Sequence, residues 1–332
     1  WLRSHFGSRH LVSRFILLPV HIFAPLAMNA IHAMKVSRTV WKDALELPDE
    51  MADTNLDSCA MNKLDDEDKV RRQLSFILDN KLPQLQWRCY QSKLHRGNLL
   101  EVLISIMKCE GVNVGAKPAV ILLCASALAI LQSEHLAFQA AMTLYSRFKL
   151  GQYFCEGQAS SRNPRLQYDS KLVWDRLQFC QPCIADAFSR YECEDLFYDL
   201  MAAWLPSLFI CTMDLNQQPV SAFLPLLNRV VEASFKQDPR TCMCQPSPCL
   251  SKRQRVDARE GLRAVALCVL TQQREVFLKA RSRSQMEGVV ARLSTHVPVD
   301  DDLLTQVDKE LSCLKLDPPT TLDTPLNWLA KA

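Results

Sequence analysis

Apolar residues recur at helical spacing along nearly the whole chain, and this is the feature that most restricts its fold. The longest stripe consists of Val220, Phe223, Leu224, Leu227, Val230 and Val231. No window of similar length alternates apolar and polar residues between turn-forming residues, as a half-buried strand does. The chain has only 8 Gly but 49 Leu among its 332 residues, a composition that favours helices over Gly-rich phosphate loops. The sequence predicts an all-α fold.

We expect about 14–16 helices joined by short connections, which place consecutive helices antiparallel to one another. The expected ranges are 8–18, 20–35, 38–46, 66–80, 83–94, 98–111, 118–133, 135–149, 169–180, 182–192, 194–204, 207–214, 219–234, 258–272, 274–294 and 302–314.

Local start and stop signals accompany these ranges. Pro118 and Pro182 suit the first turn of a helix, where the missing N–H costs nothing. Asn98 is expected to cap the N-terminus of the helix that follows it. Gly151 is expected to end the preceding helix, and Pro225 to kink or restart one.

The order of the helices predicts an irregular α-solenoid, or stacked helical hairpins. No period of fixed length is found, so the sequence does not support a regular tetratricopeptide, ankyrin or HEAT array. The segment 151–168 is polar and divides the chain into an N-terminal lobe, 1–150, and a C-terminal lobe, 169–314, followed by a tail, 315–332. A single continuous array is the alternative. An acidic loop is expected at 47–66.

The first residue is Trp1, so we expect a fragment or a processed product. Three apolar runs stand out, at 15–28, 119–131 and 196–213, but each is too short or too interrupted for a membrane span. No membrane association is therefore expected. Many of the 14 Cys lie inside apolar stretches, where they read as small buried hydrophobes. This pattern predicts a reducing compartment, the nucleus or the cytosol.

Five cysteines are candidate metal ligands. Cys180 and Cys183 form a C-x-x-C pair, and Cys242, Cys244 and Cys249 cluster further along the chain. Four thiolates close a tetrahedral zinc shell, so the two groups together are able to supply one. The alternative is that the first pair lies at a helix start and the second group is a loop of free thiols. A thioredoxin-type redox site lacks its expected strand here.

Motifs of catalysis are missing from the sequence. There is no G-x-S-x-G, no phosphate-binding G-x-x-x-x-G-K-[ST] and no H-E-x-x-H among the seven His. Glu194, Asp195 and Asp199 form an acidic group, in which the first two suit a helix start. Asp199 lies in an apolar run and needs a partner if it is buried. We expect no enzyme, no cofactor and no small-molecule substrate.

A short basic run is similar to a nuclear localisation signal. Lys252, Arg253 and Arg255 lie in a predicted loop, 236–257, that also holds three Pro and three Cys. Extended Lys and Arg side chains fit the acidic groove of an import receptor. The run predicts a nuclear location, with the cytoplasm as the alternative.

The leading functional hypothesis is a non-enzymatic helical scaffold that binds other proteins, because stacked hairpins leave extended outer surfaces. Terminal helices lack one neighbour, so apolar residues there are candidate interface residues. These are Leu11, Phe15, Leu326, Trp328 and Leu329.

The general character of the chain is similar to that of irregular all-helical subunits of large nuclear assemblies, such as the complexes of genome maintenance and DNA repair. No residue motif assigns it to one family. The second hypothesis is a nucleic-acid-binding helical subunit that uses the basic segments 252–263 and 279–283. The third is a zinc protein or an enzyme of unrecognised type.

Overall fold

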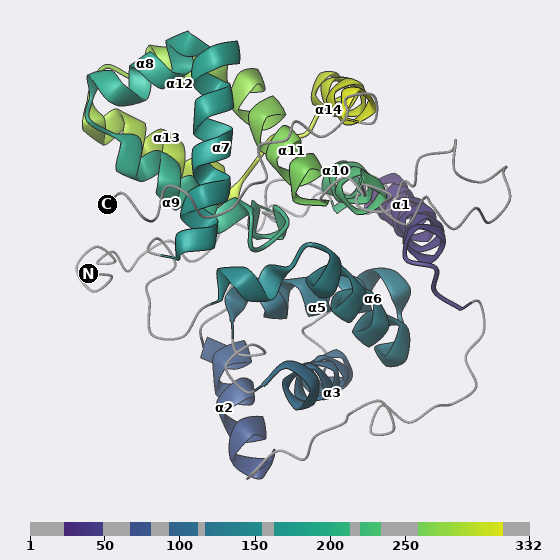
Figure 1. The fold of residues 1–332 in the computed structure, drawn as a ribbon. Coiled ribbons are helices and arrows are strands. Elements are labelled where there is room, and N and C mark those ends of the chain that lie inside the picture. The colour runs from purple at the N-terminus through teal and green to yellow at the C-terminus, as the bar shows by residue number, and fades with distance from the viewer. Residues whose placement is uncertain are drawn as a thin grey trace, which may run out of the picture.

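The computed structural model describes residues 23–48, 67–80, 93–111, 117–154, 163–212, 220–233 and 258–314 (Figure 1). Every regular element within these ranges is helical, so the predicted all-α class is confirmed. The α-helices are α1 (Phe23–Ala44), α2 (Glu67–Asn80), α3 (Lys93–Glu110), α5 (Pro118–Leu131), α6 (Glu134–Arg147), α7 (Pro164–Cys180), α8 (Pro182–Arg190), α9 (Glu194–Trp204), α10 (Val220–Ala233), α11 (Ala258–Gln272), α12 (Arg274–Lys279), α13 (Arg283–Thr295) and α14 (Asp301–Cys313). Two 3-10 helices are η5 (Leu150–Tyr153) and η7 (Ile210–Thr212).

The helices fall into groups that Figure 1 separates clearly. Helices α2, α3, α5 and α6 gather on one side, and α7, α8, α9, α12 and α13 on the other. Helix α11 packs against α7 and α14, and α1 lies along α10. Helix α2 packs against α3, which in turn packs against α5 and α6. The solenoid, and the division into lobes at 151–168, stay predictions.

Helix α5 lies at the centre of its group. Its 14 residues carry no charge, and all but three of them are buried. A helix that is apolar on every side is stable only inside a protein, so neighbours must surround it. It packs against α6, α3, α1 and η7.

A buried polar link joins α1 to α10. The indole Nε1 of Trp41 donates to Asn228 Oδ1 at 3.2 Å, and Asn228 Nδ2 donates to Ser37 Oγ at 3.0 Å. Trp41 and Ser37 are both fully buried. Arg38 Nε also donates to the carbonyl oxygen of Ile130, at 3.0 Å, which ties α1 to the end of α5. Helix α1 therefore contacts elements of both predicted lobes.

Two predicted helix starts are confirmed, and two N-caps were not predicted. Pro118 and Pro182 occupy the first turns of α5 and α8. Ser133 caps α6, because its hydroxyl accepts the N–H of Leu136 at 3.4 Å. Asn163 caps α7, since its Oδ1 accepts the N–H groups of Arg165 and Leu166, at 2.9 and 3.0 Å. That cap starts α7 at Pro164, five residues before the predicted start.

Other predicted boundaries are wrong. In the described part of the chain, the two predicted helices 20–35 and 38–46 are one helix, α1, which runs from Phe23 to Ala44. Asn98 is not an N-cap, because α3 begins at Lys93 and runs through it. Gly151 does not end α6: the chain turns at Lys149, whose φ is 50°, and Gly151 lies in η5.

Three further ranges differ from expectation. The range 274–294 is two helices, α12 and α13, because Ser282 Oγ accepts the N–H of Gln285 at 3.3 Å and starts a new helix. In the described part of the range 207–214, which ends at residue 212, the one regular element is η7. Pro225 lies inside α10, which is assigned as one helix. The ranges 8–18 and most of 83–94 lie outside the described residues.

Candidate functional site

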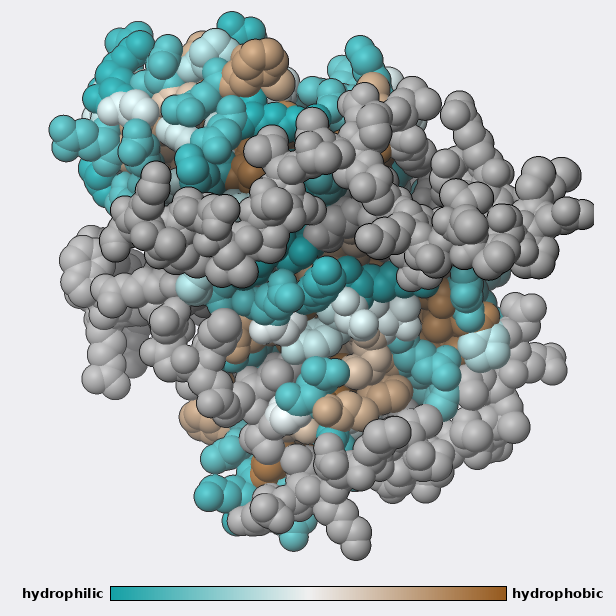
Figure 2. Space-filling model, viewed as in Figure 1, coloured by the Kyte–Doolittle hydropathy of each residue, from teal (hydrophilic) through white to brown (hydrophobic). Residues whose placement is uncertain are grey.

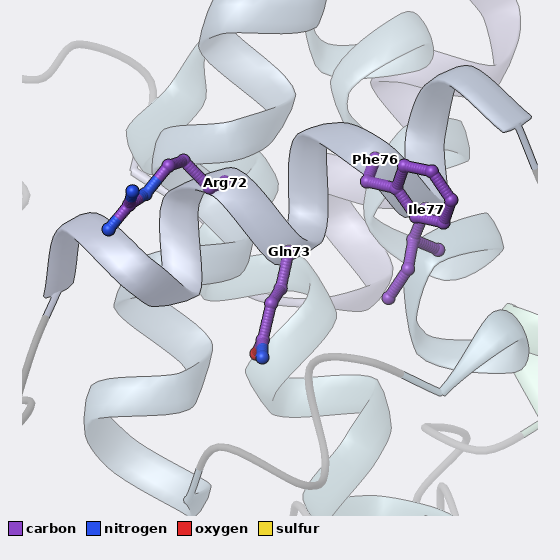
Figure 3. A pocket seen from close by; sticks show the side chains of 4 residues that line it. All are labelled: Arg72, Gln73, Phe76 and Ile77. Atoms are coloured by element: carbon purple, nitrogen blue, oxygen red, sulfur yellow. The ribbon is translucent and has the colours of Figure 1, made fainter.

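An open hollow of about 380 Å³ lies on the surface of α2. The described side chains that line it are Arg72, Gln73, Phe76 and Ile77, which project from two successive turns of the helix (Figure 3). Positions one turn apart share a helix face, so the four form one continuous surface. We call this surface the α2 hollow. Phe76 is 58% exposed, a high value for a large apolar side chain.

The opposite face of α2 fixes the helix in place. Val70, Leu74 and Leu78 are buried and pack toward α3. Beside them, Arg71 donates to both carboxylate oxygens of Glu101 on α3, at 2.5 and 2.9 Å. It also donates to Glu67 at 2.7 Å. We call this group the α2–α3 ion-pair ladder. It sets the helix rotation and leaves Phe76 exposed, whereas Ile77 is partly buried and packs against the core.

The ladder shifts the pKa of Arg71 and of Glu67 in the directions expected for paired charges. Hydrogen bonding to Glu101, opposed by burial, raises the pKa of Arg71 above its ordinary value. The hydrogen bond from Arg71 lowers the pKa of Glu67, with a smaller contribution from Lys108, whose Nζ lies 3.3 Å from a Glu67 oxygen. Both shifts mean that the charged forms are stabilised in the folded protein.

Other large apolar side chains are exposed at isolated positions on the surface. Phe179, near the end of α7, is 88% exposed, and Leu278 on α12 is 44% exposed. Figure 2 shows that hydrophilic side chains cover most of the α7, α8 and α9 group, with isolated hydrophobic ones between them. Single exposed apolar residues are normal on protein surfaces. The α2 hollow differs because Phe76 and Ile77 line it together.

A second group of charged residues surrounds a buried carboxylate, Asp169 on α7. It is fully buried and accepts hydrogen bonds from Arg165 at 3.0 and 3.1 Å, Arg263 at 2.5 Å and the Tyr153 hydroxyl at 2.9 Å. Arg259 Nη1 lies 3.9 Å away. We call these five residues the Asp169 cluster. Burial, and then the negative charge of Asp169, raises the pKa of Tyr153.

The Asp169 cluster joins three elements, η5, α7 and α11. A buried carboxylate is stable only when it is paired and hydrogen-bonded, and Asp169 meets both conditions. Ion pairs and hydrogen bonds to Asp169 hold its partners in place and connect the three elements.

Two arginines of the Asp169 cluster belong to a segment that the sequence predicts to contact nucleic acid. Arg259 and Arg263 belong to the basic segment 252–263, and the structure places both inside, with side chains 5% and 12% exposed. The prediction that these two residues lie on the surface, where they could contact phosphate, is therefore wrong. Arg283, in the segment 279–283, pairs with Asp195 on α9 at 2.5 Å. Lys279 pairs with Glu275 at 3.2 Å.

The C-x-x-C thiols lie on two different helices. Cys180 is the last residue of α7 and is exposed, whereas Cys183 is the second residue of α8 and is partly buried. Both are free thiols. Within the described ranges, no group of three or more His, Cys, Asp and Glu residues is arranged to hold a metal ion. Cys242, Cys244 and Cys249 lie outside those ranges, so the zinc hypothesis stays a prediction.

Cys124 and Cys268 are buried, as predicted, and so is Cys193, whereas Cys211 is partly buried. Burial raises the pKa of Cys211 to about 11 and that of Cys268 to about 12. Burial also raises the pKa of Cys124 and of Cys193. A thiol that stays protonated is a poor nucleophile and a poor metal ligand. These four residues therefore act as packing groups.

The acidic group on α9 is not a buried site. Asp199 is exposed, although partial desolvation and the charge of Asp195 raise its pKa. Glu194 accepts a hydrogen bond from the Ser189 hydroxyl at 2.8 Å. Asp195 is held by Arg283. Asp199 therefore needs no buried partner.

The remaining predicted residues lie outside the described part of the chain. They are Lys252, Arg253, Arg255, Leu11, Phe15, Leu326, Trp328 and Leu329.

Two of the features above were not predicted. Phe76 falls off the apolar stripe that runs through Val70, Leu74 and Leu78, and this offset was the available signal. Asp169 has only Arg165, one turn earlier, as a local signal, because Arg263 is 94 residues away.

Among the described residues, no helix is both long and apolar enough to cross a membrane. No protein-family model matches the chain, and no curated protein matches it at a significant level.

Proposed function

We propose that this protein is a non-catalytic helical scaffold that binds a protein partner at the α2 hollow, as a subunit of a larger nuclear assembly. The observation that carries the proposal is the 58% exposure of Phe76 beside Ile77 in a surface hollow. Full burial of a Phe side chain contributes about 1.5–3 kcal/mol. More than half of the surface of Phe76 is exposed to solvent.

The position of α2 supports the proposal. Of the described elements, α3 is its main neighbour, so one face of α2 is open. The ladder to Glu101 holds the helix without using the open face. A surface fixed by its own packing costs less entropy on binding than one that must first become ordered.

The charges favour a protein over a nucleic acid. Arg263, Lys279 and Arg283, which belong to the predicted basic segments, pair with carboxylates of the chain itself. A phosphate backbone needs several free cations along one surface. An apolar hollow instead matches the apolar contacts of a protein interface.

Site-specific photo-crosslinking tests the proposal. In the full chain in cells, p-benzoylphenylalanine replaces Gln73 inside the hollow or, as the matched control, Ser75, an exposed residue of the same helix outside the lining. We expect a protein adduct at position 73 that is lost in a second variant also carrying Phe76→Ser, and no such adduct at position 75.

Three results would contradict the proposal: no adduct at position 73, an adduct that Phe76→Ser leaves unchanged, or an adduct that nuclease removes. The last result would favour the nucleic-acid hypothesis. Nuclear location is tested separately by imaging a fluorescent fusion with and without Lys252→Ala, Arg253→Ala and Arg255→Ala. We expect the triple variant to lose nuclear accumulation.

A further inference from the structure

The connection between α12 and α13 is a short, exposed segment. Helix α12 ends at Lys279, Ser282 caps α13, and α13 begins at Arg283. All five residues from 281 to 285 are exposed. The hydroxyl of Ser284, the second residue of α13, makes no hydrogen bond to any described residue. This hydroxyl is therefore accessible and not engaged in holding the fold.

Positive charge precedes the Ser284 hydroxyl in the chain. Lys279, Arg281 and Arg283 lie five, three and one residues before it. The exposed guanidinium of Arg281 forms no ion pair with a described residue, whereas its backbone N–H donates to Gln285 Oε1 at 2.7 Å. Protein kinases select substrates by charge, and one class of them places an acidic groove against basic residues that precede the acceptor. The segment fits the substrate pattern of that class.

We propose that Ser284 is a phosphorylation site for a serine kinase that recognises basic residues before the acceptor. In the reaction, Ser284 Oγ attacks the γ-phosphorus of ATP, and the bond from that phosphorus to the ADP oxygen breaks. The hydroxyl proton passes to the catalytic base of the kinase. The inference does not depend on the proposed function, because α12 and α13 belong to a different group of helices from α2.

The neighbouring serines are poorer acceptors than Ser284. Ser282 is engaged, because its hydroxyl oxygen caps α13. Ser294, near the other end of α13, is only partly exposed, and its hydroxyl donates to the carbonyl oxygen of Ala291 at 2.8 Å. Among the five residues before Ser294, the one cation is Arg292. Ser284 alone of these three combines an unengaged hydroxyl with basic residues at three alternate positions before it.

Mass spectrometry of the full chain tests the site in two ways. The purified protein is treated with Mg-ATP and the catalytic subunit of cyclic-AMP-dependent protein kinase, which reads basic residues, and phosphate is measured at each serine. The same measurement is made on the chain isolated from cells treated with a phosphatase inhibitor. The variants are Ser284→Ala, Arg281→Gln and, as the matched control, Arg292→Gln. All three residues are exposed, so each variant is expected to fold, and circular dichroism checks this.

We expect phosphate on Ser284 in both samples and its loss in Ser284→Ala. Modification of Ser284 by the purified kinase is expected to be about tenfold slower in Arg281→Gln, because one charge-assisted contact is lost, and unchanged in Arg292→Gln. Ser294 is expected to react at least about tenfold more slowly than Ser284.

The absence of phosphate from Ser284 in either sample would overturn the inference, and so would a rate that Arg281→Gln leaves unchanged. Modification of Ser282 in place of Ser284 would overturn it as well. Glu287 lies three residues after Ser284. Loss of the phosphate in Glu287→Gln but not in Arg281→Gln would indicate a kinase that reads acidic residues, and this result would also contradict the proposal.

Discussion

Two of the groups in which arginine meets carboxylates, one on α2 and α3 and one around Asp169, have different surroundings. In the α2–α3 ion-pair ladder, the side chains of Arg71 and Glu101 are 32% and 43% exposed. In the Asp169 cluster, the carboxylate is fully buried and Arg263 is 12% exposed. Water screens the first group and is excluded from the second, so similar contacts have different energetic consequences. We therefore expect the buried Asp169 cluster to contribute more to stability than the partly exposed ladder.

The largest expected effect follows from removing the buried carboxylate. Asp169→Ala leaves Arg263 and Arg259 in the interior without their anion, and we expect the free energy of unfolding to fall by about 3–5 kcal/mol. Urea denaturation followed by circular dichroism measures it. Asp175→Ala, which removes an exposed pair with Lys171, is the matched control and is expected to cost under about 1 kcal/mol. Similar losses of stability in the two variants would contradict the expected difference between a buried and an exposed carboxylate.

A smaller effect is expected from the hydroxyl that completes the cluster. Tyr153→Phe removes one hydrogen bond to Asp169 but keeps the ring, so we expect a loss of about 1–2 kcal/mol in the same denaturation assay. Tyr198→Phe, on the partly buried surface of α9, serves as the control and is expected to change little. An unchanged midpoint for Tyr153→Phe would mean that Asp169 does not depend on this donor.

The ladder on α2 is expected to contribute less than the buried cluster. Arg71→Gln removes two partly exposed ion pairs, and we expect a loss of about 0.5–1 kcal/mol. The loss is expected to shrink in 0.5 M salt, because ions screen exposed charges. If Arg71→Gln lowered the free energy of unfolding as much as Asp169→Ala, the ladder would contribute as much to stability as the buried cluster.

Acid is expected to loosen α2 before the rest of the protein. The pKa of Glu67 is lowered in the folded state from its ordinary value of 4.5. Its contribution to stability is therefore present above pH 4.5 and is lost as the pH falls through the folded-state value. Hydrogen exchange of α2 amides, compared at pH 7 and near pH 4 after correction for intrinsic rates, measures the change. Glu67→Gln is expected to remove the pH dependence, and its persistence in that variant would contradict the assignment.

The smallest effect on stability is expected at the α2 hollow itself. Phe76→Ser removes a side chain that is mostly exposed, so we expect a change within about 0.5 kcal/mol. Phe277→Ser, at a fully buried residue of α12, is the contrasting variant and is expected to cost several times more. A large loss at Phe76 would mean that its ring supports the fold rather than a partner.

The sequence predicts the helices well where apolar periodicity and local caps agree. Helices α5 and α11 match their predicted ranges within two residues, because each has a buried apolar face and few competing signals. Helix α1 was predicted as two helices, 20–35 and 38–46, and the predicted break falls at Ser37. That Ser is buried and accepts a hydrogen bond from Asn228, 191 residues away, a tertiary contact that local sequence does not reveal.

The polar features are harder to predict for the same reason. Periodicity describes which residues are apolar, not which charged residues meet. Arg259 and Arg263 look like surface cations in the sequence, yet Asp169, about 90 residues earlier, draws them inside. The open side of α2 is visible in the sequence only as Phe76 out of register with Leu74 and Leu78.

The buried link between α1 and α10 has a consequence for synthesis on the ribosome. Trp41 is made early, but its partner Asn228 emerges 187 residues later. At ordinary elongation rates of about 5–20 residues per second, α1 waits roughly 10–40 s for the surface that covers its indole. Until then, the apolar face of α1 is exposed and accessible to a chaperone. The contact between α1 and α10 therefore forms late, after α10 has been synthesised.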